Sequence, residues 1–148
     1  MYSTTCIAGW ADMDYNGHMK NTAFLDKAAD VRLLYFKEQG FAVTEFARLR
    51  IGPVVVRDEI DYRKEVNLHE ELTLGLALAG VSDDGSRWLL QSDVLRQTKL
   101  CARVRASGAW LDLDARKLVA PPPALYAALI QLDRTADYAS LRGAVRGN

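Results

Sequence analysis

The chain has 148 residues, of which 49% are hydrophobic and 26% charged, and Lys plus Arg equal Asp plus Glu at 19 each. That length suits one compact domain with a buried core. The balanced charge lacks the basic excess typical of proteins that bind nucleic acid or acidic membranes. Two cysteines fit neither a disulfide framework nor a four-ligand zinc site. The sequence has no apolar run long enough to cross a bilayer and no signal-peptide pattern, so we expect a cytoplasmic protein.

The N-terminal third predicts a strand, a turn and a helix. Residues Tyr2 to Trp10 are rich in β-branched and aromatic side chains without helical spacing, which indicates a strand. Apolar side chains then recur every three or four positions, which predicts a helix buried on most sides. Asn21 or Thr22 can cap its start, and Gly40 suits the left-handed position that closes it. The residues with this spacing are Phe24, Leu25, Ala28, Val31, Leu34 and Tyr35.

Four more strands are predicted after the helix, because β-branched and apolar residues alternate with smaller or polar ones. Ser82 to Ser86, with the sequence SDDGS, favours a hairpin turn between two of them. Pro123 lies near the first turn of a predicted short C-terminal helix. The four predicted strands are Val54 to Val66, Leu72 to Ala79, Arg87 to Gln97 and Leu100 to Leu113.

This order of elements predicts an α+β domain in which an antiparallel sheet is wrapped around one long helix. We expect the domain to span residues 1–135 and residues 136–148 to form a polar C-terminal tail that frays. An open sheet keeps exposed edge strands, and such edges favour pairing with a second copy. The sequence therefore also predicts a dimer formed through a sheet edge.

The segment DMDYNGHMKN, residues 12–21, has two interpretations. Asp12, Asp14, Asn16 and Gly17 match the opening positions of an EF-hand calcium loop. The twelfth position of such a loop needs a bidentate Glu and is an alanine here, and the preceding segment is predicted as a strand instead of a helix. We therefore predict that the protein holds no metal ion at this segment.

In the second interpretation the segment is a catalytic turn that leads into a helix. The first backbone amides of a helix have no partner within it and lie at the positive end of its dipole. They can polarise a carbonyl group and stabilise an oxyanion. Asp14 lies a few residues upstream, where its carboxylate can activate water as a general base or attack directly as a nucleophile. The alternative is that Asp14 only forms the turn and caps the helix.

Residues 10–32, WADMDYNGHMKNTAFLDKAADVR, resemble the signature of the hotdog-fold acyl-CoA thioesterases, in the branch of 4-hydroxybenzoyl-CoA thioesterase. Residues 53–74, PVVVRDEIDYRKEVNLHEELTL, resemble the second strand of that family and the turn after it. Lys20 departs from the signature, since it replaces the first of two Asn residues. The positions that match the signature are Asp12, Asp14, Gly17, His18 and Asn21.

The resemblance implies a hotdog fold and hydrolysis of an acyl-CoA or acyl-carrier-protein thioester to a carboxylic acid and a thiol. It makes Asp14 the catalytic carboxylate and places Gly17, His18 and Asn21 in substrate binding, with the amide near Asn21 polarising the thioester carbonyl. It further implies a homodimer or a dimer of dimers, no metal, and no cofactor beyond the coenzyme A of the substrate. The alternative function is a non-catalytic hotdog module that binds acyl thioesters as a sensor or carrier.

Overall fold

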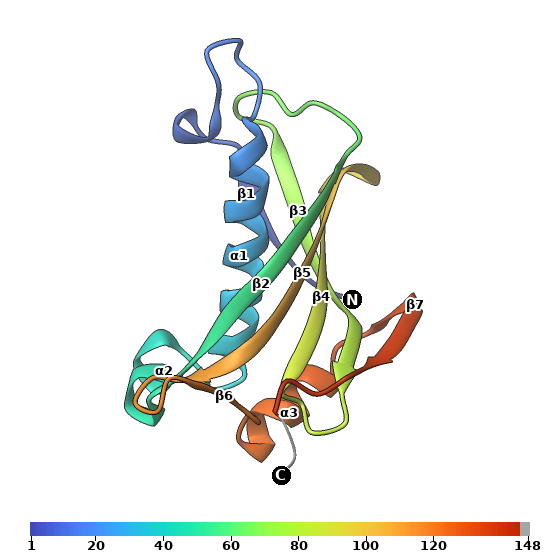
Figure 1. The fold of residues 1–148 in the computed structure, drawn as a ribbon. Coiled ribbons are helices and arrows are strands. Elements are labelled where there is room, and N and C mark those ends of the chain that lie inside the picture. Colours follow the sequence, from blue (N-terminus) through green and yellow to red (C-terminus); the bar gives the residue numbers. More distant parts are fainter. Residues whose placement is uncertain (146–148) are drawn as a thin grey trace.

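A curved sheet with three α-helices makes up the computed structural model, which describes residues 1–145 (Figure 1). The strand order is β1-β3-β4-β5-β2, with β6 beside β5 and β7 beside β3. The strands are β1 Tyr2–Ile7, β2 Ile51–Tyr62, β3 Glu71–Ser82, β4 Arg87–Arg96, β5 Lys99–Asp112, β6 Lys117–Val119 and β7 Arg134–Leu141. The helices are α1 Asn21–Glu38, α2 Val43–Leu49 and α3 Pro123–Ile130, preceded by a short 3-10 helix, η1, at Trp10–Asp12.

The predicted α+β architecture is confirmed, because all strand pairs except β3 with β7 are antiparallel and α1 lies along one face of the sheet (Figure 1). The alternation predicted for β3 is also confirmed. Its leucines point toward α1 and are buried, together with Trp88 of β4 and Trp110 of β5. Those leucines are Leu72, Leu74, Leu76 and Leu78.

Helix α1 has 18 residues and differs from its prediction in two respects. Its N-cap is Lys20, which makes no side-chain capping bond, so the prediction of Asn21 or Thr22 was wrong. The helix is buried on one side only, since Leu33 is 39% exposed and the charged side chains near it in the helical projection are exposed as well. The C-terminal prediction is confirmed, because Gly40 has a φ of 95°. Across residues 1–145, no helix combines the length and the apolar character needed to cross a bilayer.

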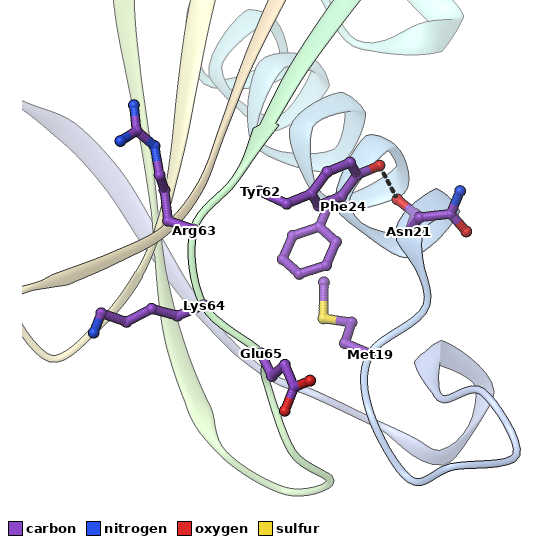
Figure 2. A pocket seen from close by; sticks show the side chains of 7 residues that line it. All are labelled: Met19, Asn21, Phe24, Tyr62, Arg63, Lys64 and Glu65. Carbon is purple, nitrogen blue, oxygen red and sulfur yellow. Dashed lines mark hydrogen bonds between the residues drawn. The ribbon is translucent and has the colours of Figure 1, made fainter.

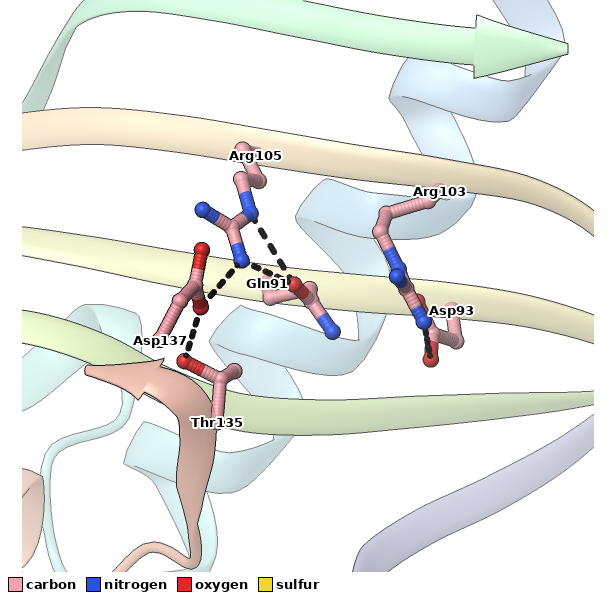
Figure 3. A network of polar contacts seen from close by, with 6 residues as sticks. All are labelled: Gln91, Asp93, Arg103, Arg105, Thr135 and Asp137. Atoms are coloured by element: carbon pink, nitrogen blue, oxygen red, sulfur yellow. Dashed lines mark hydrogen bonds and ion pairs between the residues drawn. The ribbon is translucent and has the colours of Figure 1, made fainter.

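Helix α2 and strands β6 and β7 were not predicted. Strand β7 begins at Arg134 and includes residues 136–141 of the expected tail. It pairs in parallel with the end of β3, on the same side of β3 as β1. Figure 3 shows what else holds it: Arg105 of β5 donates to Gln91 and to Asp137 of β7, in front of the strands, with α1 behind them.

Acid should loosen β7. Hydrogen bonds from Arg105 and Thr135 lower the pKa of Asp137 to about 2. A carboxylate whose pKa is lower in the folded than in the unfolded state stabilises the fold above its unfolded pKa, and this contribution is lost as the pH falls through the folded value. We expect the β7 amides to lose hydrogen-exchange protection between about pH 4 and about pH 2. In Asp137→Asn protection should be weaker at neutral pH and should change less over that interval.

Candidate active site between the β1–α1 loop and helix α1

Residues 13–19 form a small hairpin that leads into α1. Met13 and Met19 are paired in an isolated bridge, and the Asp14 amide donates to the His18 carbonyl oxygen at 2.8 Å. The Gly17 amide closes the turn on the Asp14 carbonyl oxygen at 3.1 Å. Gly17 has a φ of 81°, in the left-handed region that glycine adopts without steric cost. The turn predicted from the sequence is therefore confirmed.

The carboxylate of Asp14 is half-buried, and its two oxygens differ in the hydrogen bonds that they accept. Oδ1 accepts hydrogen bonds from the amides of Asn16 at 2.9 Å and His18 at 3.1 Å, as in an Asx turn. Oδ2 accepts no hydrogen bond from any residue between 1 and 145. One oxygen thus holds the turn, and the other is left available for chemistry.

The start of α1 borders a pocket of about 290 Å³ (Figure 2). The amides of Asn21 and Thr22 precede the first amide that donates back, Ala23 to the Lys20 carbonyl, and so have no acceptor within the helix. The Tyr62 hydroxyl donates to the Asn21 carbonyl oxygen at 3.2 Å, and its ring lies edge-on to Phe24. The lining residues are Met19, Asn21, Phe24, Tyr62, Arg63, Lys64 and Glu65.

Asp14 lines a different hollow, with a volume of about 480 Å³. Trp10 and Tyr15 border it and are 79% and 98% exposed. Within a single chain the structure therefore does not bring Asp14 and Asn21 into one pocket, although seven positions separate them. The Met13–Met19 bridge lies between the two, since Met13 lines the hollow of Asp14 and Met19 lines the pocket of Asn21.

His18 connects the hairpin to the loop after β2. Its backbone pairs with Asn67, and its Nε2 lies 3.3 Å from Oε2 of Glu65, which lines the pocket of Asn21. Both of these side chains are well exposed, so the contact contributes little to stability. Gly17 lines neither hollow.

The calcium interpretation finds no support in the loop. The chain enters the loop from strand β1 through the three-residue 3-10 helix η1, where an EF-hand has a full α-helix. Asp12 accepts a hydrogen bond from the Gly9 amide and pairs with Lys27. Over the described part of the chain, no three His, Cys, Asp or Glu side chains are grouped so that they could hold a metal ion.

Comparison with known protein families identifies the family of the chain. Residues 8–129 match a protein family described as the thioesterase-like superfamily. The chain belongs to this superfamily. This match confirms the resemblance to the hotdog-fold thioesterases that the sequence motifs indicated. No curated protein matches its sequence.

Several solved structures share the fold of this chain at low sequence identity. A 1,4-dihydroxy-2-naphthoyl-CoA thioesterase from Synechocystis is 16% identical with a TM-score of 0.79, over 88% of this chain and 96% of the other. A Staphylococcus aureus protein solved in complex with CoA is 17% identical with a TM-score of 0.80, over 87% and 81% of the two chains. A probable thioesterase from Escherichia coli is 21% identical with a TM-score of 0.74, over 88% and 97%.

Two features of the pocket of Asn21 were not predicted from the sequence: the wall formed by Phe24 and Tyr62, and the position of Glu65 on the rim. A signal for the first was present. The alternation of β2 places Tyr62 on the same face as Ile60, toward the helix, at the strand end nearest the start of α1. Arg63 and Lys64 line the pocket by their stems, and Figure 2 shows their charged ends extending away from Phe24 and Met19.

Proposed function

We propose that the protein hydrolyses an acyl-CoA or acyl-carrier-protein thioester to a carboxylic acid and a thiol. The observation that carries this proposal is the carboxylate of Asp14, held by the amides of Asn16 and His18 with Oδ2 open, a short hairpin away from the unpaired amides of α1. Membership of the thioesterase-like superfamily and the similarity to a naphthoyl-CoA thioesterase support the reaction class. The similarity to a protein in complex with CoA supports coenzyme A as the thiol.

The chemistry needs a nucleophile and a site for the charge that develops on the carbonyl oxygen. In the proposed reaction the amides at Asn21 and Thr22 donate to that oxygen, so that the negative charge of the tetrahedral intermediate lies at the positive end of α1. Asp14 accepts a proton from water, and the water oxygen bonds to the carbonyl carbon. The carbon–sulfur bond then breaks, and the proton passes to the departing thiolate. In the alternative, Asp14 itself attacks, and water hydrolyses the resulting anhydride.

Two copies of the chain are proposed to complete the site, since Asp14 and Asn21 border different hollows in one copy. The sheet order leaves the outer side of the 12-residue strand β2 without a partner over the described residues. Val55 and Val56 on this strand are 42% and 63% exposed. Antiparallel pairing of two β2 strands would satisfy their open backbone groups and cover this apolar surface. Each α1 would then be the central helix of a hotdog fold, and two such dimers could assemble further.

A charge on the β2 edge should prevent this pairing. We expect Val56→Asp to sediment as a monomer and to lose thioesterase activity, because an aspartate at this position would be buried without a partner in the dimer. Ile7→Asp is the matched control, since Ile7 is 60% exposed on β1 at the opposite side of the sheet. This control should sediment like the unmodified protein. A Val56→Asp variant that remains dimeric would place the interface elsewhere.

A thiol-release assay tests the reaction itself. Short, long, aromatic and charged acyl-CoAs, and the corresponding acyl-carrier-protein thioesters, should be compared with and without a metal chelator. Release of thiol from at least one of them, unchanged by the chelator, is the expected result. Tight binding without thiol release over the whole panel would instead support the non-catalytic sensor or carrier. Substitution of Gly17 or His18 should weaken substrate binding if these residues have the proposed roles.

A further inference from the structure

An ion pair beneath the hairpin joins the loop of the proposed catalytic residue to the body of helix α1. The Lys27 ammonium lies 3.2 Å from Oδ2 of Asp12, and the two side chains are only 14% and 17% exposed. Most of the other ion pairs over residues 1–145 are considerably more exposed. Lysine is seldom buried to this degree unless its charge is paired.

Asp12 is the point at which three segments of the chain meet. Its Oδ2 accepts from the Gly9 amide at 2.8 Å, in addition to the contact with Lys27. Its backbone oxygen accepts from the amide of Lys20, the N-cap of α1, at 2.8 Å. Asp12 is therefore fixed to Gly9 just after β1, to the residue before α1 and to the second turn of α1.

The position of Asp14 follows from that of Asp12, because only Met13 separates them. The other side of the hairpin is fixed independently, since the Met19 amide donates to the carbonyl of Val66 at 2.8 Å. Loss of the contact with Lys27 would release only the side of the hairpin that carries Asp14. A shift of the order of 1 Å in a reacting group can lower a rate by about a hundredfold.

We propose that Lys27 is a positioning residue, which acts through Asp12 to set the place of Asp14 relative to the start of α1. This inference depends on the proposed function of Asp14. Lys27 lies on the buried side of the loop and lines neither of the two hollows, so it has no direct contact with substrate. Its substitution should therefore change the chemical step more than substrate binding.

The test compares variants of the full-length protein in thiol release and in hydrogen exchange. Lys27→Met should lower kcat by about tenfold and leave KM within about twofold. Lys27→Arg keeps the charge and should restore most of the activity. Lys37→Met, in the exposed last turn of the same helix, is the matched control and should behave like the unmodified protein. Thermal unfolding identifies any variant that is not folded at the assay temperature, and the assay temperature is lowered accordingly.

Hydrogen exchange separates this inference from the proposed function. The amides of Asn16 and His18, which donate to Asp14, should exchange at least about threefold faster in Lys27→Met, whether or not the protein is an enzyme. Unchanged exchange of these two amides would overturn the inference. So would an unchanged kcat in Lys27→Met when Asp14→Ala is inactive. Full activity of Asp14→Ala would overturn the proposed function. The hydrogen-exchange result would then show whether the ion pair of Lys27 with Asp12 holds the hairpin in place.

Discussion

Replacement of Asp14 by Asn should lower kcat by more than about a hundredfold in a protein that remains folded. An asparagine oxygen can accept the same two hydrogen bonds from the amides of Asn16 and His18, and asparagine forms the same kind of turn. The variant therefore keeps the hairpin and loses only the negative charge and the basicity. Asp14→Ala removes the hydrogen-bonding oxygen as well as the charge, and it should be at least as inactive. Steady-state thiol release, with circular dichroism to verify the fold, measures the effect.

Asp112 offers a matched control for this substitution. Its Oδ1 accepts from the amides of Asp114 and Ala115, both at 2.9 Å, so it is also a carboxylate that holds a turn. It lies at the end of β5, away from both hollows. Asp112→Asn should leave kcat unchanged. Near-full activity of both Asp14→Asn and Asp14→Ala would show that Asp14 only forms the turn, and another group would then have to activate water.

The largest expected effect on stability is that of Gly108→Ala. Gly108 lies on β5 opposite Trp88, whose side chain is fully buried. A Cβ atom at position 108 would overlap the indole ring, and even the ring atom Cε2 would be only 2.6 Å away. Trp88 has little room to move, since it packs beside Trp110 and beneath Arg32. We expect a loss of about 3 kcal/mol in the free energy of unfolding, at the upper end for overpacked cores.

Urea denaturation followed by circular dichroism measures this loss, with Gly52→Ala on β2 as the control. The nearest atom to a Cβ at position 52 is Cδ2 of Leu113 at 4.0 Å, an ordinary contact, so that variant should differ by less than about 1 kcal/mol. Trp88→Phe in the Gly108→Ala background should recover part of the stability, because phenylalanine has the smaller ring. An unfolding free energy of Gly108→Ala close to that of Gly52→Ala would contradict the packing argument.

The sequence predicts well the elements whose burial is periodic. The leucines of β3 alternate from Leu72 to Leu78, and the spacing from Phe24 to Tyr35 identifies α1. Strand β7 escapes prediction, since it is mostly exposed and depends on the contact between Asp137 and Arg105, 32 positions apart in the chain. The N-cap of α1 was misplaced because Lys20 caps through its backbone conformation, which a rule based on side-chain oxygens does not detect.

For the candidate site, the sequence identifies the loop and the helix start but not their arrangement. The Asp, Asn and Gly residues of the segment predict the turn, and Asp14 indeed holds it. The separation of Asp14 from the pocket of Asn21 follows from the pairing of Met13 with Met19, which no local pattern encodes. The role of Asp12 is of the same kind, because its partner Lys27 is recognisable only once the loop is folded onto α1.

The two edges of the sheet differ in how well they could pair with a strand of another molecule. On one side, the neighbours of β3 are two short strands that run in opposite directions, so an incoming strand meets no continuous template. On the other side, β2 is one continuous strand of twelve residues that all run in the same direction. Among residues 1–145, β2 is the one long strand with an open edge, so association by strand addition would use this edge in each molecule and would then stop. The architecture favours closed pairs over open-ended fibres, and the protein should remain free of filaments even at high concentration.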